Sequence, residues 1–389
     1  MATGCRGKPA TNKHRMNQQL SSFAARLRES INAGFQNEDF DAFALELFAL
    51  QFKNNFAYRN ICQARKLSPE IVEHWSQIPA VPTAAFKELE LTSLEAQERT
   101  AVFHSSGTTG QKPSRHFHNA ESLAVYEASL WRWFEQNFFQ NPKSKIQNPK
   151  LILLTPPPDL VPHSSLVHMF ETVRQKFGGA SVFASRTEFL GKLAADGSWT
   201  LDFEATLATL SDSSKSKTQN PKLIFGTAFS FVHLLDFLAE NDLRFQLPEN
   251  SRVMETGGYK NRSRSLPKSE LHAFITERLG VPRENIICEY GMSELSSQAY
   301  DLEIQNPESR IQNRSFHFPP WARVQIISPE TNQEVRDGET GLIRVFDLAN
   351  VFSVAAIQTE DLGVRRGDGF ELIGRAQMVE PRGCSLMTA

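Results

Sequence analysis

A segment rich in glycine and hydroxyl side chains carries the strongest chemical signal in the sequence. Its two glycines permit positive φ and close backbone approach, so successive N–H groups and hydroxyls can surround phosphate oxygens. Lys112 follows and adds a mobile positive charge. The pattern GxxxxGK followed by Ser or Thr is absent, which excludes an ordinary P-loop. Alone, the segment also fits a polar surface turn; its residues are Ser105, Ser106, Gly107, Thr108, Thr109 and Gly110.

Two further motifs follow later in the chain. Residues 289–294 read EYGMSE, residues 359–363 read TEDLG, and a Gly374-Arg375 pair comes after them. Together with the hydroxyl-rich segment, and in this order, they resemble the signatures of the adenylate-forming superfamily. That superfamily includes acyl-CoA synthetases, phenylacetate-CoA ligases and nonribosomal adenylation domains. The resemblance implies a ligase that uses ATP and Mg²⁺ and forms an acyl-adenylate.

A closer resemblance covers most of the chain, from about residue 45 to residue 385. Five segments are similar to acyl-protein synthetases of the LuxE type. They are residues 44–62, 78–87 and 226–229, the ETGGYK run at 255–260 and the RGCS run at 382–385. These enzymes activate fatty acids for the fatty-acid reductase of bacterial luminescence. The resemblance therefore implies a fatty or related carboxylic acid substrate, and an acyl reductase or carrier protein as partner.

The resemblance also implies roles for individual residues. The hydroxyl-rich segment and Lys112 would hold the phosphates, and Lys260 is a second candidate for the phosphate-side lysine. Glu294 would bind Mg²⁺, a cation that takes oxygen ligands. The residues expected around adenine, ribose and the acyl group are Gly257, Gly258, Tyr290, Gly291, Asp361 and Arg375. Each also has a structural alternative: Tyr290 as a core aromatic, Glu294 as a solvated acid and Asp361 as a turn residue.

Cys384 is the cysteine to which the resemblance assigns a covalent role. A thiolate attacks an acyl-adenylate readily and the resulting thioester is a good acyl donor. Arg382 would favour the thiolate, and the alternative is a tail cysteine without a role. Cys62 and Cys288 lie in apolar stretches and are predicted to be buried as small hydrophobic residues. No CxxC pair occurs, and His116-x-His118 lacks further ligands, so no zinc site is assigned from the sequence.

Apolar strand-like runs alternate with amphipathic helical runs, which predicts an α/β fold with a substantial parallel sheet. Strands are expected near 151–155, 223–226, 286–290, 324–327 and 341–346, and helices near 121–138, 165–177, 231–241 and 268–279. In the terms of the resemblance, this is an adenylate-forming synthetase-like N-terminal domain with mixed and parallel sheets flanked by helices. A small β-rich C-terminal part follows, and the full C-terminal domain that supplies a catalytic lysine is expected to be absent.

The expected domain organisation has three parts. Residues 1–22 are expected to form a disordered tail and 23–323 the adenylate-forming core. Polar, mutually similar insertions are expected in that core near 141–150, 211–222 and 304–314. Residues 324–389 are expected to form the β-rich subdomain with the acyl-accepting tail.

Composition excludes several classes of protein. The 389 residues are 40% hydrophobic and 22% charged with a formal net charge of −2, so there is no general electrostatic attraction to nucleic acid or anionic membranes. No apolar run reaches the roughly 18 residues of a membrane span. Four widely spaced cysteines suit a reducing, cytoplasmic setting.

These observations lead to one main prediction and two alternatives. The main prediction is ATP-dependent activation of a fatty acid, self-acylation on Cys384 and transfer to a partner protein. The first alternative is a ligase that passes the acyl group to CoA or a carrier. The second is a catalytically inactive nucleotide-binding scaffold.

Overall fold

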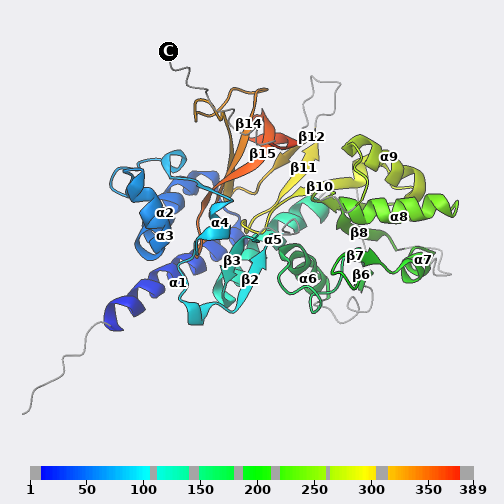
Figure 1. Cartoon of the computed structure of the whole chain (residues 1–389), viewed down its shortest axis with the longest axis horizontal. Coiled ribbons are helices and arrows are strands. Elements are labelled where there is room, and N and C mark those ends of the chain that lie inside the picture. The colour runs from blue at the N-terminus through cyan, green and yellow to red at the C-terminus, as the bar shows by residue number, and fades with distance from the viewer. Residues whose placement is uncertain are drawn as a thin grey trace, which may run out of the picture.

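One large mixed sheet organises the molecule (Figure 1). The computed structural model describes residues 10–105, 112–139, 149–178, 187–211, 220–259, 263–303 and 314–376. Within these ranges twelve strands join this sheet, and two short hairpins stand apart, β2 (Ala101–His104) with β3 (Arg115–His118) and β6 (Gly191–Leu193) with β7 (Trp199–Leu201).

The parallel part of the sheet runs in the order β10-β9-β8-β4-β5. Strands β8, β9 and β10 are buried along their whole length, as expected for parallel strands covered on both faces. Their bounds are β4 Lys150–Leu153, β5 Thr187–Phe189, β8 Lys222–Thr227, β9 Arg252–Thr256 and β10 Ile286–Tyr290.

Antiparallel strands continue the sheet beyond β10 in the order β11-β12-β16-β15-β14-β13, and β1 pairs parallel with β15. The last four strands of the described residues thus extend the same hydrogen-bonded sheet. Their bounds are β1 Val81–Pro82, β11 Ala299–Glu303, β12 Arg314–His317, β13 Ala322–Ile327, β14 Thr340–Asp347, β15 Ala356–Arg366 and β16 Gly369–Arg375.

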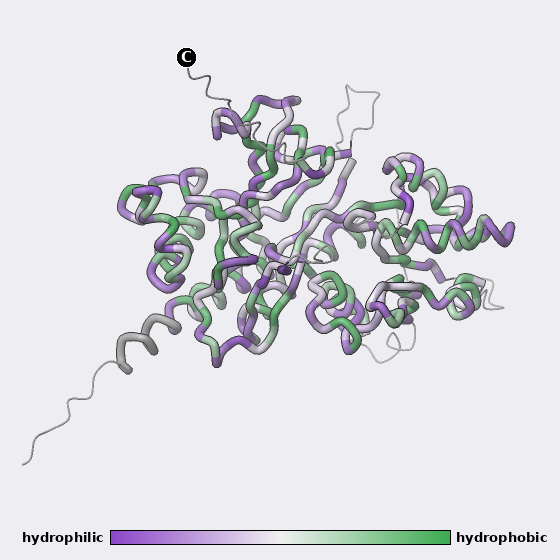
Figure 2. The backbone as a smooth tube through the Cα atoms, in the orientation of Figure 1, coloured by the Kyte–Doolittle hydropathy of each residue, from purple (hydrophilic) through white to green (hydrophobic). Residues whose placement is uncertain are grey.

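Helices cover both faces of the parallel strands. Alternate residues of a strand point to opposite faces, so Ile152 and Ile224 pack with α7, α8 and α9, while Leu151 and Leu223 face α5 and α6. Hydrophobic and hydrophilic residues alternate along the helices, as expected for amphipathic segments (Figure 2). The helices are α1 Ala10–Ala33, α2 Phe40–Asn54, α3 Phe56–Ala64, α4 Ala85–Glu88, α5 Ala120–Phe139, α6 Ser165–Gly178, α7 Phe203–Ser211, α8 Ala228–Glu240 and α9 Lys268–Leu279. None of these helices is both long and apolar enough to cross a membrane.

The predicted α/β class and the main elements are confirmed, with α9 and β10 at their predicted bounds. The expected disordered tail over 1–22 is wrong from Ala10 onwards, because α1 begins there. Leu20, Phe23, Leu27 and Ile31 recur every three or four residues and are wholly buried. That apolar stripe packs α1 against α5, and the stripe begins before the predicted boundary. Residues 1–9 lie outside the described part.

The polar insertions fall largely outside the described residues, but their predicted edges need correction. Lys150, Lys222 and Arg314 were placed within insertions, and each instead begins a strand of the main sheet. Lys222 is buried, and its ammonium group donates to the carbonyl of Thr209 at 2.9 Å. A polar side chain can therefore belong to a buried strand when its end finds a partner. The predicted boundary between 323 and 324 falls inside β13.

Candidate active site

A large cleft opens where the parallel strands end. It has a volume of about 2020 Å³ and is lined by residues that follow or end β8, β9 and β10, together with residues of β15 and β16. In α/β proteins the carboxyl ends of parallel strands are the usual place for a ligand. Tyr290 and Asp361 belong to motifs identified separately in the sequence, and both line this cleft.

Tyr290 and Asp361 are joined by a hydrogen bond. The Tyr290 hydroxyl donates to Asp361 Oδ2 at 2.9 Å, and Asp361 Oδ1 lies 3.7 Å from Nε of the exposed Arg375 side chain. The Tyr290 ring packs edge-on against Phe316 and Phe370. Burial raises the pKa of Tyr290 well above its usual value, and burial also raises the pKa of Asp361. Tyr290 is therefore a core aromatic whose polar end faces the cleft.

Glycines shape the backbone where β9 and β10 end. Gly257 has φ +67°, a left-handed conformation that favours glycine, while a Cβ at Gly258 would meet open space. A Cβ at Gly291 would overlap the carboxylate of Glu289. All three glycines line the cleft, so backbone is exposed there without side-chain obstruction.

Glu289 is a buried acid that sequence reasoning overlooked as a candidate. Its carboxylate lines the cleft and accepts a hydrogen bond from the Thr256 hydroxyl. Burial raises its pKa to about 7. The available signal was its position directly before Tyr290, inside the EYGMSE motif.

Glu294 is also buried, with only 5% of its surface exposed, yet it lines the cleft. Its Oε2 accepts a hydrogen bond of 3.0 Å from the Ser293 hydroxyl, and its backbone carbonyl accepts one from Asn350. The alternative of a solvated surface acid does not fit this burial. The carboxylate is a hard oxygen donor facing a cavity, which is the donor chemistry that Mg²⁺ prefers.

The predicted phosphate-side residues are only partly described. Ser105 lines the cleft, and its hydroxyl accepts a hydrogen bond from the Ser114 N–H at 3.0 Å. Lys112 does not line the cleft; its Nζ lies 3.6 Å from Glu88 Oε2, and both side chains are exposed. An exposed ion pair of this kind is weak and easily exchanged. The remaining predicted residues Ser106, Gly107, Thr108, Thr109, Gly110, Lys260 and Cys384 lie outside the described residues.

Apolar residues line another part of the same cleft. They come from α6, from the loop before it, from β7 and from the start of α8. The residues are Leu160, Leu166, Met169, Trp199, Ala228 and Phe229. The cleft thus combines polar groups at the ends of β9 and β10 with apolar surface.

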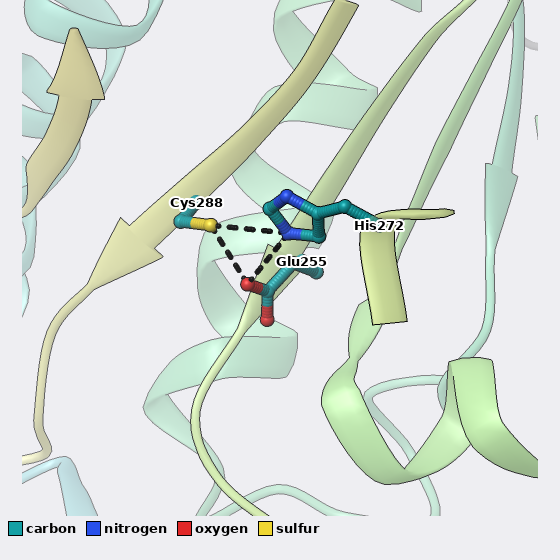
Figure 3. Close-up of side chains that lie close together, drawn as sticks. All are labelled: Glu255, His272 and Cys288. Carbon is teal, nitrogen blue, oxygen red and sulfur yellow. Dashed lines mark hydrogen bonds and ion pairs between the residues drawn. The ribbon is translucent and has the colours of Figure 1, made fainter. Parts of the chain in front are cut away.

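Cys288 is buried, as predicted for Cys62 and Cys288, but its predicted role as a small hydrophobic residue is wrong. Its thiol lies among polar groups. Its thiol donates to Glu255 Oε1 at 2.7 Å, and His272 Nε2 lies 3.5 Å from the sulfur (Figure 3). Burial is the main reason that the pKa of this thiol is raised. Glu255, His272 and Cys288 lie on β9, α9 and β10, so the spacing of residues in the sequence does not predict that they meet.

The architecture defines the class of the protein. The structure resembles a solved 2-hydroxyisobutyryl-CoA ligase in complex with an acyl-adenylate, with a TM-score of 0.57 over 96% of this chain and 73% of that chain. The sequence identity is 12%, so this likeness establishes the fold alone, which is that of the adenylate-forming ligases.

Sequence comparison then identifies the family. The family described as acyl-protein synthetase, LuxE, matches residues 30–389, and the chain belongs to it. A long-chain-fatty-acid–luciferin-component ligase of Aliivibrio fischeri is 25% identical over 381 residues, covering 91% of this chain and 89% of the relative. The ligase of the same name from Vibrio harveyi is 24% identical over 356 residues, covering 87% and 84%. The protein is thus an acyl-protein synthetase, which is a ligase.

Proposed function

We propose that this ligase converts a long-chain fatty acid into an acyl-adenylate, acylates itself on Cys384 and passes the acyl group to a partner such as an acyl reductase. The observation that carries the proposal is the single cleft in which Tyr290, Asp361 and Glu294 meet an apolar lining. A nucleotide and an acyl chain need such neighbouring polar and apolar surfaces. The volume of about 2020 Å³ exceeds the range of roughly 300–1,000 Å³ of ordinary ligand pockets.

In the first step a carboxylate oxygen attacks the α-phosphorus of ATP, the P–O bond to the β-phosphate breaks and pyrophosphate leaves. Catalysis of this kind depends on positioning and on compensation of charge. Asp361 would accept hydrogen bonds from the ribose hydroxyls, held in place by Tyr290. Gly257, Gly258 and Gly291 would admit the nucleotide close to the backbone.

The phosphate side of the site would be formed by residues 105–110 with Lys112, Lys260 and Arg375. Lys112 would leave its exposed contact with Glu88 to reach a phosphate. Mg²⁺ would be held by Glu294, whose buried carboxylate faces the cleft. A bound Mg²⁺ supplies neutralisation of phosphate charge.

In the second step the Cys384 sulfur attacks the acyl carbonyl carbon, AMP leaves and a thioester forms. The thiolate is the nucleophile, so the thiol proton must go to solvent or to a base. A reducing compartment such as the cytoplasm keeps such a thiol free. The partner then takes the acyl group from the thioester, which is a good acyl donor.

Carboxylate-dependent exchange between ATP and pyrophosphate tests the first step. Aromatic, short-chain and long-chain acids are compared at equal concentration. We expect exchange to be fastest with the long-chain acids, because they alone fill the apolar part of the cleft. Exchange restricted to aromatic or short acids would contradict the proposed substrate class.

The mass of the protein after incubation with ATP and acid tests the second step. We expect one acyl group on the wild-type chain and on Cys62→Ala, and none on Cys384→Ala, while all three retain pyrophosphate exchange. Acyl transfer to CoA that survives in Cys384→Ala would contradict self-acylation and favour a CoA ligase.

A further inference from the structure

Three potential metal donors converge between β9, α9 and β10. Cys288 Sγ lies 2.7 Å from Glu255 Oε1 and 3.5 Å from His272 Nε2, and the imidazole and carboxylate atoms are 3.3 Å apart (Figure 3). All three side chains are buried, with exposed fractions of 7%, 0% and 3% for Glu255, His272 and Cys288. The imidazole and the thiol therefore point at the same carboxylate oxygen.

This triangle is close to one face of a tetrahedral zinc site. Zinc lies about 2.3 Å from sulfur and about 2.0–2.1 Å from nitrogen or oxygen, so its ligand atoms are separated by roughly 3.3–3.6 Å. The Sγ–Nε2 and Nε2–Oε1 separations fall in that range. The Sγ–Oε1 separation, now a hydrogen bond, would have to open by about 0.8 Å. The cluster is not arranged like a catalytic triad of nucleophile, histidine and acid. In a triad the nucleophile and the acid contact opposite ring nitrogens. Here the thiol and the carboxylate both lie beside Nε2 of His272.

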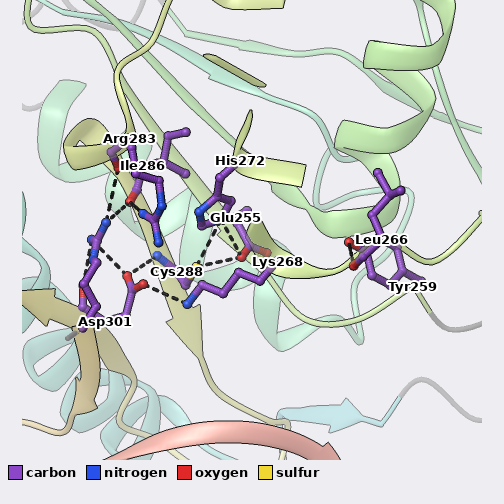
Figure 4. A network of polar contacts seen from close by, with 10 residues as sticks. Glu255, Tyr259, Leu266, Lys268, His272, Arg283, Ile286, Cys288 and Asp301 are labelled. Atoms are coloured by element: carbon purple, nitrogen blue, oxygen red, sulfur yellow. Dashed lines mark hydrogen bonds and ion pairs between the residues drawn. The ribbon is translucent and has the colours of Figure 1, made fainter. Parts of the chain in front are cut away.

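Positive groups also lie beside the cluster, and Lys268 interacts with both Cys288 and Asp301. Lys268 Nζ lies 2.9 Å from Asp301 Oδ2 (Figure 4). Arg314 Nη2 lies 3.2 Å from Asp301 Oδ1. Asp301 also accepts a hydrogen bond from the backbone N–H of Cys288 at 2.6 Å. This buried acid thus compensates part of the neighbouring positive charge, and the Glu255 carboxylate contacts the thiol and the imidazole.

We propose that Glu255, His272 and Cys288 form a zinc-binding site that is distinct from the Mg²⁺ position proposed at Glu294. Thiolate and imidazole donors select Zn²⁺ over the hard cations that oxygen-only sites take. As the zinc–sulfur bond forms, the thiol proton leaves to solvent. Glu255 and Cys288 line the cleft, so the fourth position of the ion opens towards it and would hold a water.

Zinc at this place would fix the strand ends that carry the nucleotide site. Glu255 stands two residues before Gly257, and Cys288 stands two residues before Tyr290. His272 would connect α9 to the same ion. The ion would therefore hold the ends of β9 and β10 at a constant separation.

The test measures metal binding directly, on the full chain without ATP, Mg²⁺ or acid. Zn²⁺ affinity is obtained by competition with a chromophoric chelator, and Co²⁺ is used as a probe for the thiolate-to-cobalt charge-transfer band. We expect one ion per chain in the wild type, Cys62→Ser and Cys384→Ser. In Cys288→Ser and His272→Gln we expect affinity to fall by on the order of 100-fold or more, because loss of a ligand exceeds loss of an outer partner.

A chain whose only cysteine is Cys288, with Cys5, Cys62 and Cys384 all replaced by Ser, covers the case in which Cys288→Ser does not fold. That chain should keep the cobalt band. Absence of the band from the wild type, or its loss from the chain that retains only Cys288, would overturn the proposal. These results do not depend on ligase activity, so they are separate from the tests of the proposed function.

Discussion

The hydroxyl of Tyr290 donates a hydrogen bond of 2.9 Å to Asp361 across 71 residues of sequence. Tyr290 ends β10 and Asp361 lies in β15, so the bond connects the parallel and antiparallel parts of the sheet. It also joins two motifs that were recognised independently. Two residues expected to contact one nucleotide are thus already coupled to each other.

Replacing Tyr290 with Phe should weaken both stability and ATP binding. The change removes the hydroxyl donor from the half-buried Asp361 carboxylate, which we expect to lower the free energy of unfolding by about 1–3 kcal/mol. If the displaced carboxylate binds ribose less well by about 1.4 kcal/mol, the KM for ATP rises about tenfold. Urea unfolding and pyrophosphate exchange at varied ATP measure the two effects.

Tyr58→Phe is the matched control for that variant. The Tyr58 hydroxyl donates to the Pro79 carbonyl at 2.9 Å, and its side chain is wholly buried but does not line the cleft. We expect a similar loss of stability and an unchanged KM for ATP. An equal rise of KM in both variants would mean that Tyr290 acts only through general stability.

Local patterns predicted the elements well but not the contacts between them. The run at 286–290 is a strand with the predicted bounds because five consecutive buried positions leave a local signature. Cys288 within it was misread, because Glu255 and His272 reach it from 33 and 16 residues away. The family resemblance assigns Tyr290 and Asp361 to one nucleotide site, but neither it nor periodicity indicates the hydrogen bond between them.

Gly257 and Gly258 offer a test of backbone conformation at the cleft. Gly257→Ala should lower the free energy of unfolding by about 1–2 kcal/mol, because alanine resists the φ of +67° found there. Gly258→Ala is the matched control, since its Cβ would meet open space and its φ is not in the left-handed region. Urea unfolding of both variants measures the difference, and equal stabilities would contradict the assigned backbone.

Asp347 anchors the loop that carries Glu294. Its Oδ2 accepts hydrogen bonds of 2.8 Å from the backbone N–H groups of Ser296 and Ser297, and its Oδ1 accepts from the Ser297 hydroxyl at 2.7 Å. Asp347→Asn places an amide among these donors, and we expect a loss of about 2–3 kcal/mol in stability.

The same substitution should lower the affinity for Mg²⁺ in pyrophosphate exchange, because the backbone that directly follows Glu294 loosens. Asp337→Asn is the control, since Asp337 is exposed and accepts one backbone hydrogen bond, from Gly367. A surface change of this kind should stay within about 0.5 kcal/mol. Asp347→Asn with wild-type stability would show that the loop does not depend on the carboxylate.

His116 should make the folded protein sensitive to mild acid. It is buried beside His118, with ring centroids 4.2 Å apart, and its Nδ1 lies 2.9 Å from the Ser293 carbonyl. Burial lowers the pKa of His116 to about 4, and burial also lowers the pKa of His118. The unfolded chain binds a proton near pH 6.5, whereas the folded chain binds it only near pH 4.

The contribution of His116 to the free energy of unfolding is therefore fully present above pH 6.5. It is lost as the pH falls towards 4, by about 3 kcal/mol in total. In His116→Asn the amide can still donate to Ser293 but does not titrate. We expect urea unfolding at pH 7 and pH 4.5 to give a smaller acid-induced loss for His116→Asn than for the wild type. An unchanged slope in His116→Asn would mean that His116 is not buried in its neutral form.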